Sequence, residues 1–210
     1  MKNINSGMLA ALVAGPDSGV VPRRFVWLTG KDRASGTAAS IGVWSGDETI
    51  DATVVSGTTG LLVARTYYGA GTLLSVSSIP RVSDLTIQTV TIDLSQIATA
   101  AQQAVRGYDL RLGKVEIHDM ALDPVSRNPA GVGEIVFLGE IDGAPISTPA
   151  VGGEGSIRLK VRSDAISMLE RSNPRKSSYE GQKRRQGDEW GKYSSTIDSW
   201  NVPWGQEKSK

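Results

Sequence analysis

The sequence predicts a mainly β protein, a β-barrel or β-sandwich with one or two short helices and an extended C-terminal arm. Between residues 23 and 163, short apolar segments alternate with clusters of glycine, proline and aspartate. Strands spaced by roughly 8–12 residues are typical of sandwiches and barrels. After residue 163 aliphatic residues become rare. A segment of that composition cannot bury enough apolar surface to form its own core.

The first 22 residues are predicted to form an N-terminal helix and a linker. Asn5-Ser6-Gly7 can cap an amphipathic helix that begins near Met8, and the segment GPDSG (15–19) stops it. The apolar run of 8–14 is too short to span a bilayer. It also lacks the basic start and cleavage site of a secretory signal. We therefore expect no membrane span.

The β-rich domain is predicted to occupy residues 23–163. Alternation and bounding turn residues indicate strands in 23–30, 40–47, 49–57, 60–69, 72–79, 84–94, 108–120, 133–143 and 145–163. The period changes in DLSQIATAAQQAV (93–105), where Leu94, Ile97, Ala101 and Val105 share one helical face. This predicts a helix near 94–105. No internal repeat is evident, so one main barrel is expected.

The stretch TYYGAGTLLSVSSI (66–79) contains Gly69-Ala70-Gly71, which raises the question of a phosphate-binding loop. The segment lacks the spacing of dinucleotide sites and the lysine of a P-loop. A strand follows it, so no helix N-terminus would point at an anion. The stretch is therefore interpreted as a turn or bulge between strands.

Composition excludes several kinds of site. The chain has no cysteine, which removes disulfides, thiolate nucleophiles and cysteine-ligated metals. His118 is its one histidine, so a two-histidine metal site cannot form within one copy. The net charge of +1 gives no general attraction to nucleic acid or to anionic membranes.

Two clusters of titratable residues are candidate sites. Glu116 and His118 share a strand face and, with Asp119 beside them, form an acid–base candidate. No activated nucleophile is near, and a lone histidine is more often found at a wet turn. The acidic residues Asp47, Glu48 and Asp51 follow a turn but lack the spacing of a calcium loop. We therefore predict no catalytic, cofactor-binding or metal site, and no enzyme.

The C-terminal arm, residues 164–210, is polar and charged but carries three tryptophans. Tryptophan and arginine are enriched at interface hot spots. Its basic run is interleaved with acidic residues, which favours a charge-complementary protein interface over nucleic acid. The arm is expected to dock on a neighbouring copy or partner; folding back on its own β domain is the other interpretation. Candidate interface residues are Arg175, Arg184, Arg185, Trp190, Trp200 and Trp204.

The order of VWSGDETI, RTYYGAGTLLSVSSI, LTIQTVTIDLSQI and IVFLGEIDG resembles the tail-tip hub and distal-tail proteins of long-tailed, siphovirus-like bacteriophages and gene transfer agents. In that family a Y-x-G-x-G-x-L-L-x-I segment and an L-x-L-S element recur. The C-terminal RRQGDEWGKYSSTIDSWNVPWG also looks like the family's tail. Some relatives carry a cysteine-rich insertion for an iron–sulfur cluster, which a chain without cysteine cannot bind.

The resemblance implies a structural virion protein at the tail tip, made in the host cytoplasm. Such a protein forms a homo-oligomeric ring, trimer or hexamer, between the tail tube and the tip or receptor-binding components. Its expected partners are further copies and the neighbouring tube, tape-measure and tail-tip proteins, with no specific nucleic acid and no cofactor. Closed rings are built from heterologous contacts, which an arm reaching to the next subunit would provide.

Two other functions remain open from the sequence. One is a carbohydrate- or surface-binding β-sandwich whose exposed tryptophans, Trp44 or Trp200, stack on sugars. The other is a hydrolase that uses Glu116, His118 or Asp119.

Overall fold

The computed structural model describes residues 4–71, 74–80, 86–95, 106–147, 155–170, 178–200 and 205. The chain divides into two compact units, Met1–Leu169 and Glu170–Lys210. Each unit is described by itself below. The division falls between the last two residues of α3 (Ala165–Glu170), a short helix that follows the last strand.

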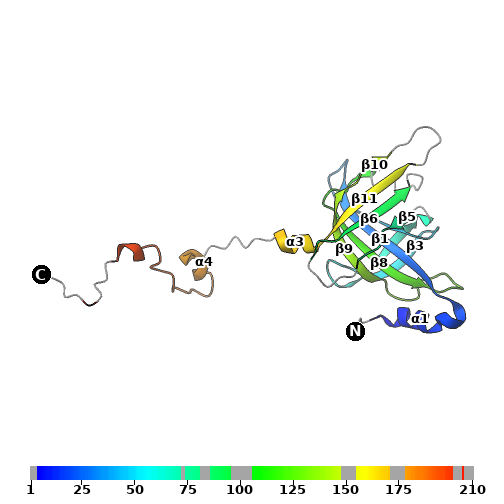
Figure 1. The fold of residues 1–210 in the computed structure, drawn as a ribbon, viewed down its shortest axis with the longest axis horizontal. Helices are drawn as coiled ribbons and strands as arrows, with labels where there is room; N and C mark the ends of the chain where they lie inside the picture. Colours follow the sequence, from blue (N-terminus) through cyan, green and yellow to red (C-terminus); the bar gives the residue numbers. More distant parts are fainter. Residues whose placement is uncertain are drawn as a thin grey trace. The chain divides into compact units, whose positions relative to one another are not determined.

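The first unit is mainly β, as predicted, and its described strands form one eleven-stranded sheet (Figure 1). The strands are β1 (Val21–Asp32), β2 (Ala38–Trp44), β3 (Ile50–Val55), β4 (Leu62–Gly69), β5 (Leu74–Val76), β6 (Thr89–Ser95), β7 (Tyr108–Asp109), β8 (Lys114–Leu122), β9 (Glu134–Gly143), β10 (Ile146–Ser147) and β11 (Ser156–Ser163). Helix α1 (Ser6–Ser18) precedes them.

The main path of the sheet runs β3-β4-β2-β1-β8-β9-β11-β6-β5, with β7 beside β1 and β10 beside β11. Neighbours along this path are antiparallel except β2 and β4, which pair in parallel through Gly42 and Tyr67. The long strands β1 and β8 are partners from Val21 opposite Leu122 to Leu28 opposite Val115. The centre of the sheet therefore joins segments almost a hundred residues apart in the chain.

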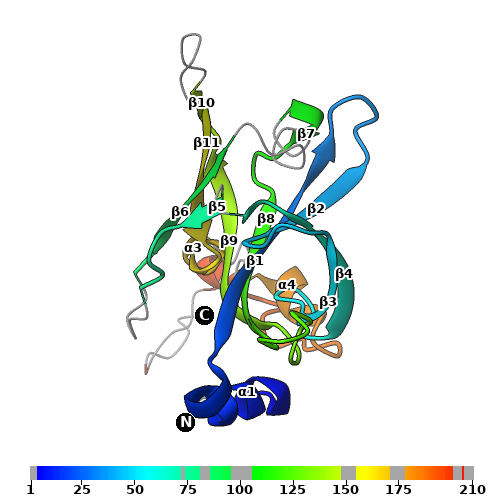
Figure 2. The same cartoon turned by 90° about the vertical axis from the view of Figure 1, so that its right-hand side faces the viewer.

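Part of the sheet closes on itself. Val54 in β3 forms a parallel bridge with Gly133, just before β9. The Val55 N–H donates to the Gly133 carbonyl at 3.0 Å, and the Gly133 N–H donates to the Thr53 carbonyl at 2.9 Å. Strands β3, β4, β2, β1 and β8 and the start of β9 thus form a small barrel, visible as a ring in Figure 2.

Strands β1 and β8 are covered on both faces and serve two cores. The apolar core lies between them and β6, β9 and β11; it includes Val26, Leu28, Ile41, Val43, Val90, Ile92, Leu94, Val115, Ile117, Phe137, Ile141, Ile157, Leu159 and Val161. The aromatic core fills the small barrel; it contains Phe25, Trp44, Ala52, Val54, Tyr67, Met120 and Leu122. Alternate residues of one strand enter opposite cores, because successive side chains of a strand point to opposite faces.

Burial on both faces explains the sequence of β8. The segment KVEIHDMAL is buried at every position except Lys114 and Asp119, which are half-buried. A strand packed on two sides reads as a near-continuous apolar run. Glu116 and His118 are the polar exceptions within this run, and both are buried.

The helix predicted near 94–105 is wrong at its start. Leu94 and Ser95 belong to β6, where Val90, Ile92 and Leu94 alternate into the apolar core. Leu94 pairs with Ile157 of β11. The alanine- and glutamine-rich composition favoured a helix, but two neighbouring strands hold this segment in β form. The rest of the prediction, 96–105, lies outside the described residues.

The predicted strand over 108–120 is two strands. β7 and β8 are separated by a turn in which Leu112 takes a φ of 58°. The N-terminal helix is confirmed, with the Asn5 side chain accepting from the Met8 N–H at 2.9 Å. The helix ends at Ser18, within the predicted stop segment. None of its residues is buried.

The second unit contains α4 (Tyr179–Lys183) and the 3-10 helix η3 (Ile197–Ser199) in its described part. The Ser178 hydroxyl caps α4 by accepting from the Gly181 N–H at 3.2 Å. Between 178 and 200 the one buried residue is Gly191. Over 178–200, turns and caps rather than an apolar core therefore hold the chain.

Candidate functional site

The strongest concentration of buried polar groups lies on the aromatic-core side of β8. The Arg65 Nη1 atom of β4 donates to Glu116 Oε2 of β8 at 2.7 Å, and the two side chains are 9% and 5% exposed. The Ser56 and Thr58 hydroxyls lie 3.4 Å from Glu116 Oε1. The barrel thus encloses an ion pair whose carboxylate is surrounded by donors.

Opposing effects set the pKa of Glu116. Burial raises the pKa of the carboxyl, but the hydrogen bond and the charge of Arg65, together with the Gly57 backbone N–H, outweigh it and lower the pKa. Burial alone would lower the pKa of Arg65, and the bond to Glu116 reverses that, so its pKa is raised. Both groups are therefore charged in the folded protein.

His118 lies beside this pair and is fully buried. Its Nε2 atom is 2.9 Å from the Val55 carbonyl oxygen and 3.5 Å from Glu116 Oε2, while its Nδ1 atom has no hydrogen-bond partner. A carbonyl can only accept, so Nε2 carries the proton. Burial lowers the pKa of His118 despite the favourable carbonyl and carboxylate nearby. The neutral ring ties β8 to β3.

Aromatic rings cover the network. The Arg65 guanidinium lies 4.6 Å from the Trp27 ring centroid, within cation–π range. Phe25 stacks on Trp44 with centroids 5.2 Å apart and meets Tyr67 edge-on at 5.0 Å. The buried Tyr67 hydroxyl has no hydrogen bond of acceptable geometry. Burial raises its pKa to about 12, although the nearby Arg65 charge works in the opposite direction.

The acid–base candidate is only partly assembled by the fold. Glu116 and His118 do share a face and lie close together, as predicted. Asp119 points to the other side of β8, where it pairs with Arg24 at 3.1 Å. The expectation of a wet turn for His118 is wrong, because it lies within β8 between two cores. A general acid or base must reach its substrate within hydrogen-bond distance, and these two side chains are buried.

Gly69-Ala70-Gly71 is a close crossing of two backbones. The Gly71 N–H donates to the Gly46 carbonyl at 2.8 Å, and the Ala70 N–H to the Trp44 carbonyl at 3.0 Å. A Cβ at Gly69 would overlap the Asp47 backbone, and Gly71 has a φ of 52°, which favours glycine. The glycines thus let the turn after β2 pack against the end of β4.

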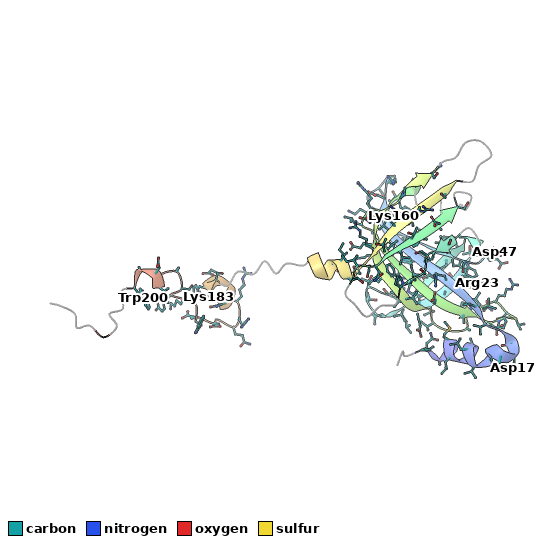
Figure 3. All side chains as sticks on the ribbon, in the orientation of Figure 1. Asp17, Arg23, Asp47, Lys160, Lys183 and Trp200 are labelled. Carbon is teal, nitrogen blue, oxygen red and sulfur yellow. The ribbon has the colours of Figure 1, made fainter. Side chains whose placement is uncertain are left out.

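A polar cleft of about 440 Å³ opens at one end of the barrel. Its lining includes Arg23, Asp47, Glu48 and Arg127, and Figure 3 labels Arg23 and Asp47. The Trp44 Nε1–H donates to the Glu48 carbonyl at 2.7 Å and so fixes the cleft floor. Charges of both signs line the cleft.

The acidic cluster after β2 does not converge. Asp51 accepts a hydrogen bond from the Thr66 hydroxyl at 2.6 Å on the β3–β4 surface, whereas Asp47 lies at the cleft. In the part of the chain that the structure describes, no group of three or more histidine, aspartate or glutamate side chains could hold a metal ion.

The predicted interface residues lie in the second unit. Arg184, Arg185, Trp190 and Trp200 are exposed, and Trp190 is 88% exposed. Tyr193 contacts Trp200, with centroids 5.7 Å apart. Arg175 and Trp204 lie outside the described residues.

Sequence reasoning missed the part that Arg65 plays. It sits in the apolar segment LLVARTYY, and an arginine in such a run is itself a signal of a buried charge that needs a partner. Its partner, Glu116, is 51 residues away. Local spacing could not pair them.

Comparison of the chain with protein-family models and with curated proteins finds no match to either. The described helices include none with the length and apolar character needed to cross a membrane.

Proposed function

We propose that this chain is a structural virion protein of a phage tail tip. It forms a homo-oligomeric ring, a trimer or hexamer, that links the tail tube to the tip or receptor-binding components. It is made in the host cytoplasm and acts in the virion. The resemblance in motif order supports this role, and a β-rich domain with a separate C-terminal unit fits it.

The observation that carries the proposal is the surface of the second unit. Over 178–200 the chain buries almost no residue. Its large apolar side chains are exposed to 88% at Trp190, 55% at Tyr193, 63% at Ile197 and 53% at Trp200. Large apolar side chains gathered on a segment without a core mark an interaction surface. Tryptophan and arginine are enriched at interface hot spots, and Arg184 and Arg185 precede Trp190 in this unit. We infer that this unit docks on a neighbouring copy.

The chemistry of the first unit supports a scaffold role. Its buried charges are paired with each other and its sheet is closed in part by the Val54–Gly133 bridge. A rigid domain with a docking segment gives heterologous contacts, which close into rings. The nearly balanced net charge lets copies approach without long-range repulsion.

The test is the assembly state of the full chain. We expect native mass measurement over a range of concentrations, with negative-stain imaging, to show a closed ring of three or six copies. Removing residues 171–210 should abolish the ring, while circular dichroism still reports a folded β domain. Leu112→Ala, at an exposed loop position outside the second unit, is the matched control. Rings that persist without 171–210 would contradict the role of the second unit.

Of the two tryptophans considered for carbohydrate binding, Trp44 is not accessible to a sugar. Trp44 is 6% exposed, stacked on Phe25 and packed against Gly46, so it cannot stack on a sugar. The exposed rings of Trp190 and Trp200 favour this alternative, because an exposed tryptophan can stack on a sugar. Glycan binding by a monomeric chain, lost in Trp200→Ala, would favour it over the ring.

A further inference from the structure

The small barrel closes along one short join. Strand β1 pairs with β8 over residues 21–28, and β3 pairs with β4 along its whole length. By contrast, β3 meets the chain just before β9 in a single bridge, between Val54 and Gly133. Local opening of a folded protein occurs where few bonds hold two parts together. The Val54–Gly133 join is therefore the place where the barrel should open.

We define the seam as residues 53–58 on one side and Glu116, His118 and Gly133 on the other. Val55 is held there through both of its backbone groups. Its N–H donates to the Gly133 carbonyl at 3.0 Å, and its carbonyl accepts from His118 Nε2 at 2.9 Å. Two hydroxyls of the turn after β3 reach Glu116 Oε1 only at 3.4 Å, which is long for a hydrogen bond. His118 is therefore a principal tie across the seam.

The seam fits the neutral form of His118. In the neutral ring the Nε2 proton is donated to Val55, and Nδ1 has no hydrogen-bond partner. Protonation would add an N–H at Nδ1, in a fully buried ring and without an acceptor. A buried charged donor without a partner is costly, whereas water would satisfy it once β3 moved away. The geometry thus couples proton uptake by His118 to the position of β3.

The charged groups around His118 do not remove this cost. Those beside it on β8, next to it in the register of β1 and β9, or carried by β3 and β4 near the seam are Arg24, Asp51, Arg65, Tyr67, Glu116, Asp119 and Glu134. Glu116, at 3.5 Å, would favour a protonated ring, but it is already paired with Arg65. Burial lowers the pKa of His118 despite Glu116.

The remaining charges have partners of their own. Asp119 lies on the other face of β8 and pairs with Arg24. Glu134, opposite Asp119, accepts from the Asn5 N–H, and Asp51 accepts from a hydroxyl on the outer surface. The burial of His118 and its bond to Val55 therefore decide its response to acid.

We propose that the seam is an acid-sensitive latch. In mild acid His118 takes up a proton and releases Val55, and the β3 edge of the β3–β4 hairpin separates from β8 and β9. Arg65 keeps β4 tied to Glu116, and β1, β8 and the apolar core stay in place. The movement exposes the backbone edges of β3 and of the chain before β9. The latch lies within one domain and does not depend on the proposed ring.

Hydrogen exchange of the full chain at about pH 7.5 tests for the local opening. The Val55 and Gly133 amides, which donate across the seam, are compared with the amides of β6 and β11. We expect protection at least about tenfold lower at the seam, with little dependence on dilute urea, because a local opening exposes little surface. Equal protection with equal urea dependence would show that the seam opens only with the whole domain, and would overturn the inference.

The same measurement at about pH 5.5 tests the role of His118. If the open form binds the proton with the usual pKa of 6.5, the opening constant should rise up to about tenfold, after correction for the intrinsic exchange rate. This rise should be absent in His118→Gln, whose amide can donate to Val55 but cannot be protonated. The same rise in His118→Gln would assign it to another group and overturn the latch.

A disulfide across the seam supplies the matched control. A Cβ at Gly133 would lie 3.5 Å from the Val54 Cβ, within the range that disulfides span, and otherwise meets the flexible end of Met120. Because the chain has no cysteine, Val54→Cys with Gly133→Cys can form one bond only. The oxidised variant should stay closed at about pH 5.5, and its reduced form should open again. Equal acid-dependent opening of both forms would contradict the proposed movement.

Discussion

The two faces of β8 are stabilised by different kinds of interaction. Val115 and Ile117 enter an apolar core that depends on buried area and packing, whereas Glu116 and His118 enter an aromatic core that encloses the Arg65–Glu116 ion pair. An apolar core loses stability in proportion to what is removed. A buried ion pair that loses one partner is destabilised by about 3–5 kcal/mol, because the other charge is left buried and alone. On one face of the strand the loss is graded with the volume removed, and on the other it is set by an unpaired charge.

Arg65→Ala should be the most damaging single change. It leaves the Glu116 carboxylate buried without its cation, at a cost of about 3–5 kcal/mol in the free energy of unfolding. Urea denaturation followed by tryptophan fluorescence measures the loss. The matched control is the double variant Arg65→Met, Glu116→Leu, which removes both charges and should restore most of the lost stability. A double variant as unstable as Arg65→Ala would contradict this account.

Leu159→Ala tests the apolar core. Leu159 is fully buried between β6 and β9, so its truncation should reduce the free energy of unfolding by about 2–5 kcal/mol through lost burial and a cavity. Leu62→Ala, at a position 63% exposed, should cost less than about 0.5 kcal/mol in a monomeric sample. Equal losses at the two positions would show that the apolar core is not packed as described.

His118 should make the protein sensitive to mild acid. Burial lowers its pKa in the folded protein below the usual 6.5, so the unfolded chain takes up a proton that the folded chain cannot. Stability is complete above pH 6.5 and falls as the pH drops toward the lowered folded pKa, by at most about 1.4 kcal/mol per pH unit. The pKa of Glu116 is also lowered, so its contribution to the free energy of unfolding is lost only as the pH falls below 4.5.

Denaturation at about pH 7.5 and 5.5 measures this effect, because the carboxyl groups stay ionised between them. The difference in the free energy of unfolding should shrink in His118→Gln, which cannot be protonated. An equal pH dependence in the variant would show that another group is responsible.

Tyr67→Phe should have the smallest effect. The Tyr67 hydroxyl is buried without a partner, so its removal should leave the free energy of unfolding within about 1 kcal/mol of the original, on the stabilising side. Chemical denaturation of both proteins checks this. A loss above about 2 kcal/mol would show that the Tyr67 hydroxyl is hydrogen-bonded, with the nearby Arg65 guanidinium as the donor.

Much of the fold could be predicted because the strands carry local signals. Apolar and aromatic runs bounded by glycine-containing turns predicted β1, β2, β4 and β9 close to their observed bounds. Leu94 ends the predicted strand over 84–94 and also begins the predicted helix, and its pairing with Leu74 and Ile157 decides for the strand. The barrel closure depends on Gly133, a residue without a side chain to give a pattern.

The candidate site shows the same limit. Glu116 and His118 could be placed on one face from their spacing, but their burial follows from β1 and β8 being covered on both sides. Whether a carboxylate beside a histidine is a wet catalytic pair or a dry structural one depends on which strands lie over it. That information is spread over the whole sheet.

The pairing of β1 with β8 also dictates the order in which the protein can fold. The small barrel cannot close until the chain has reached Gly133, and the apolar core must wait for β11, which ends at Ser163. Pairing across such long separations is slow, on the order of milliseconds to seconds in all-β proteins. During synthesis β1 to β4 would emerge with unpaired edges, which are prone to aggregate. Because one pair of strands is the wall of both cores, the two should form in a single cooperative step.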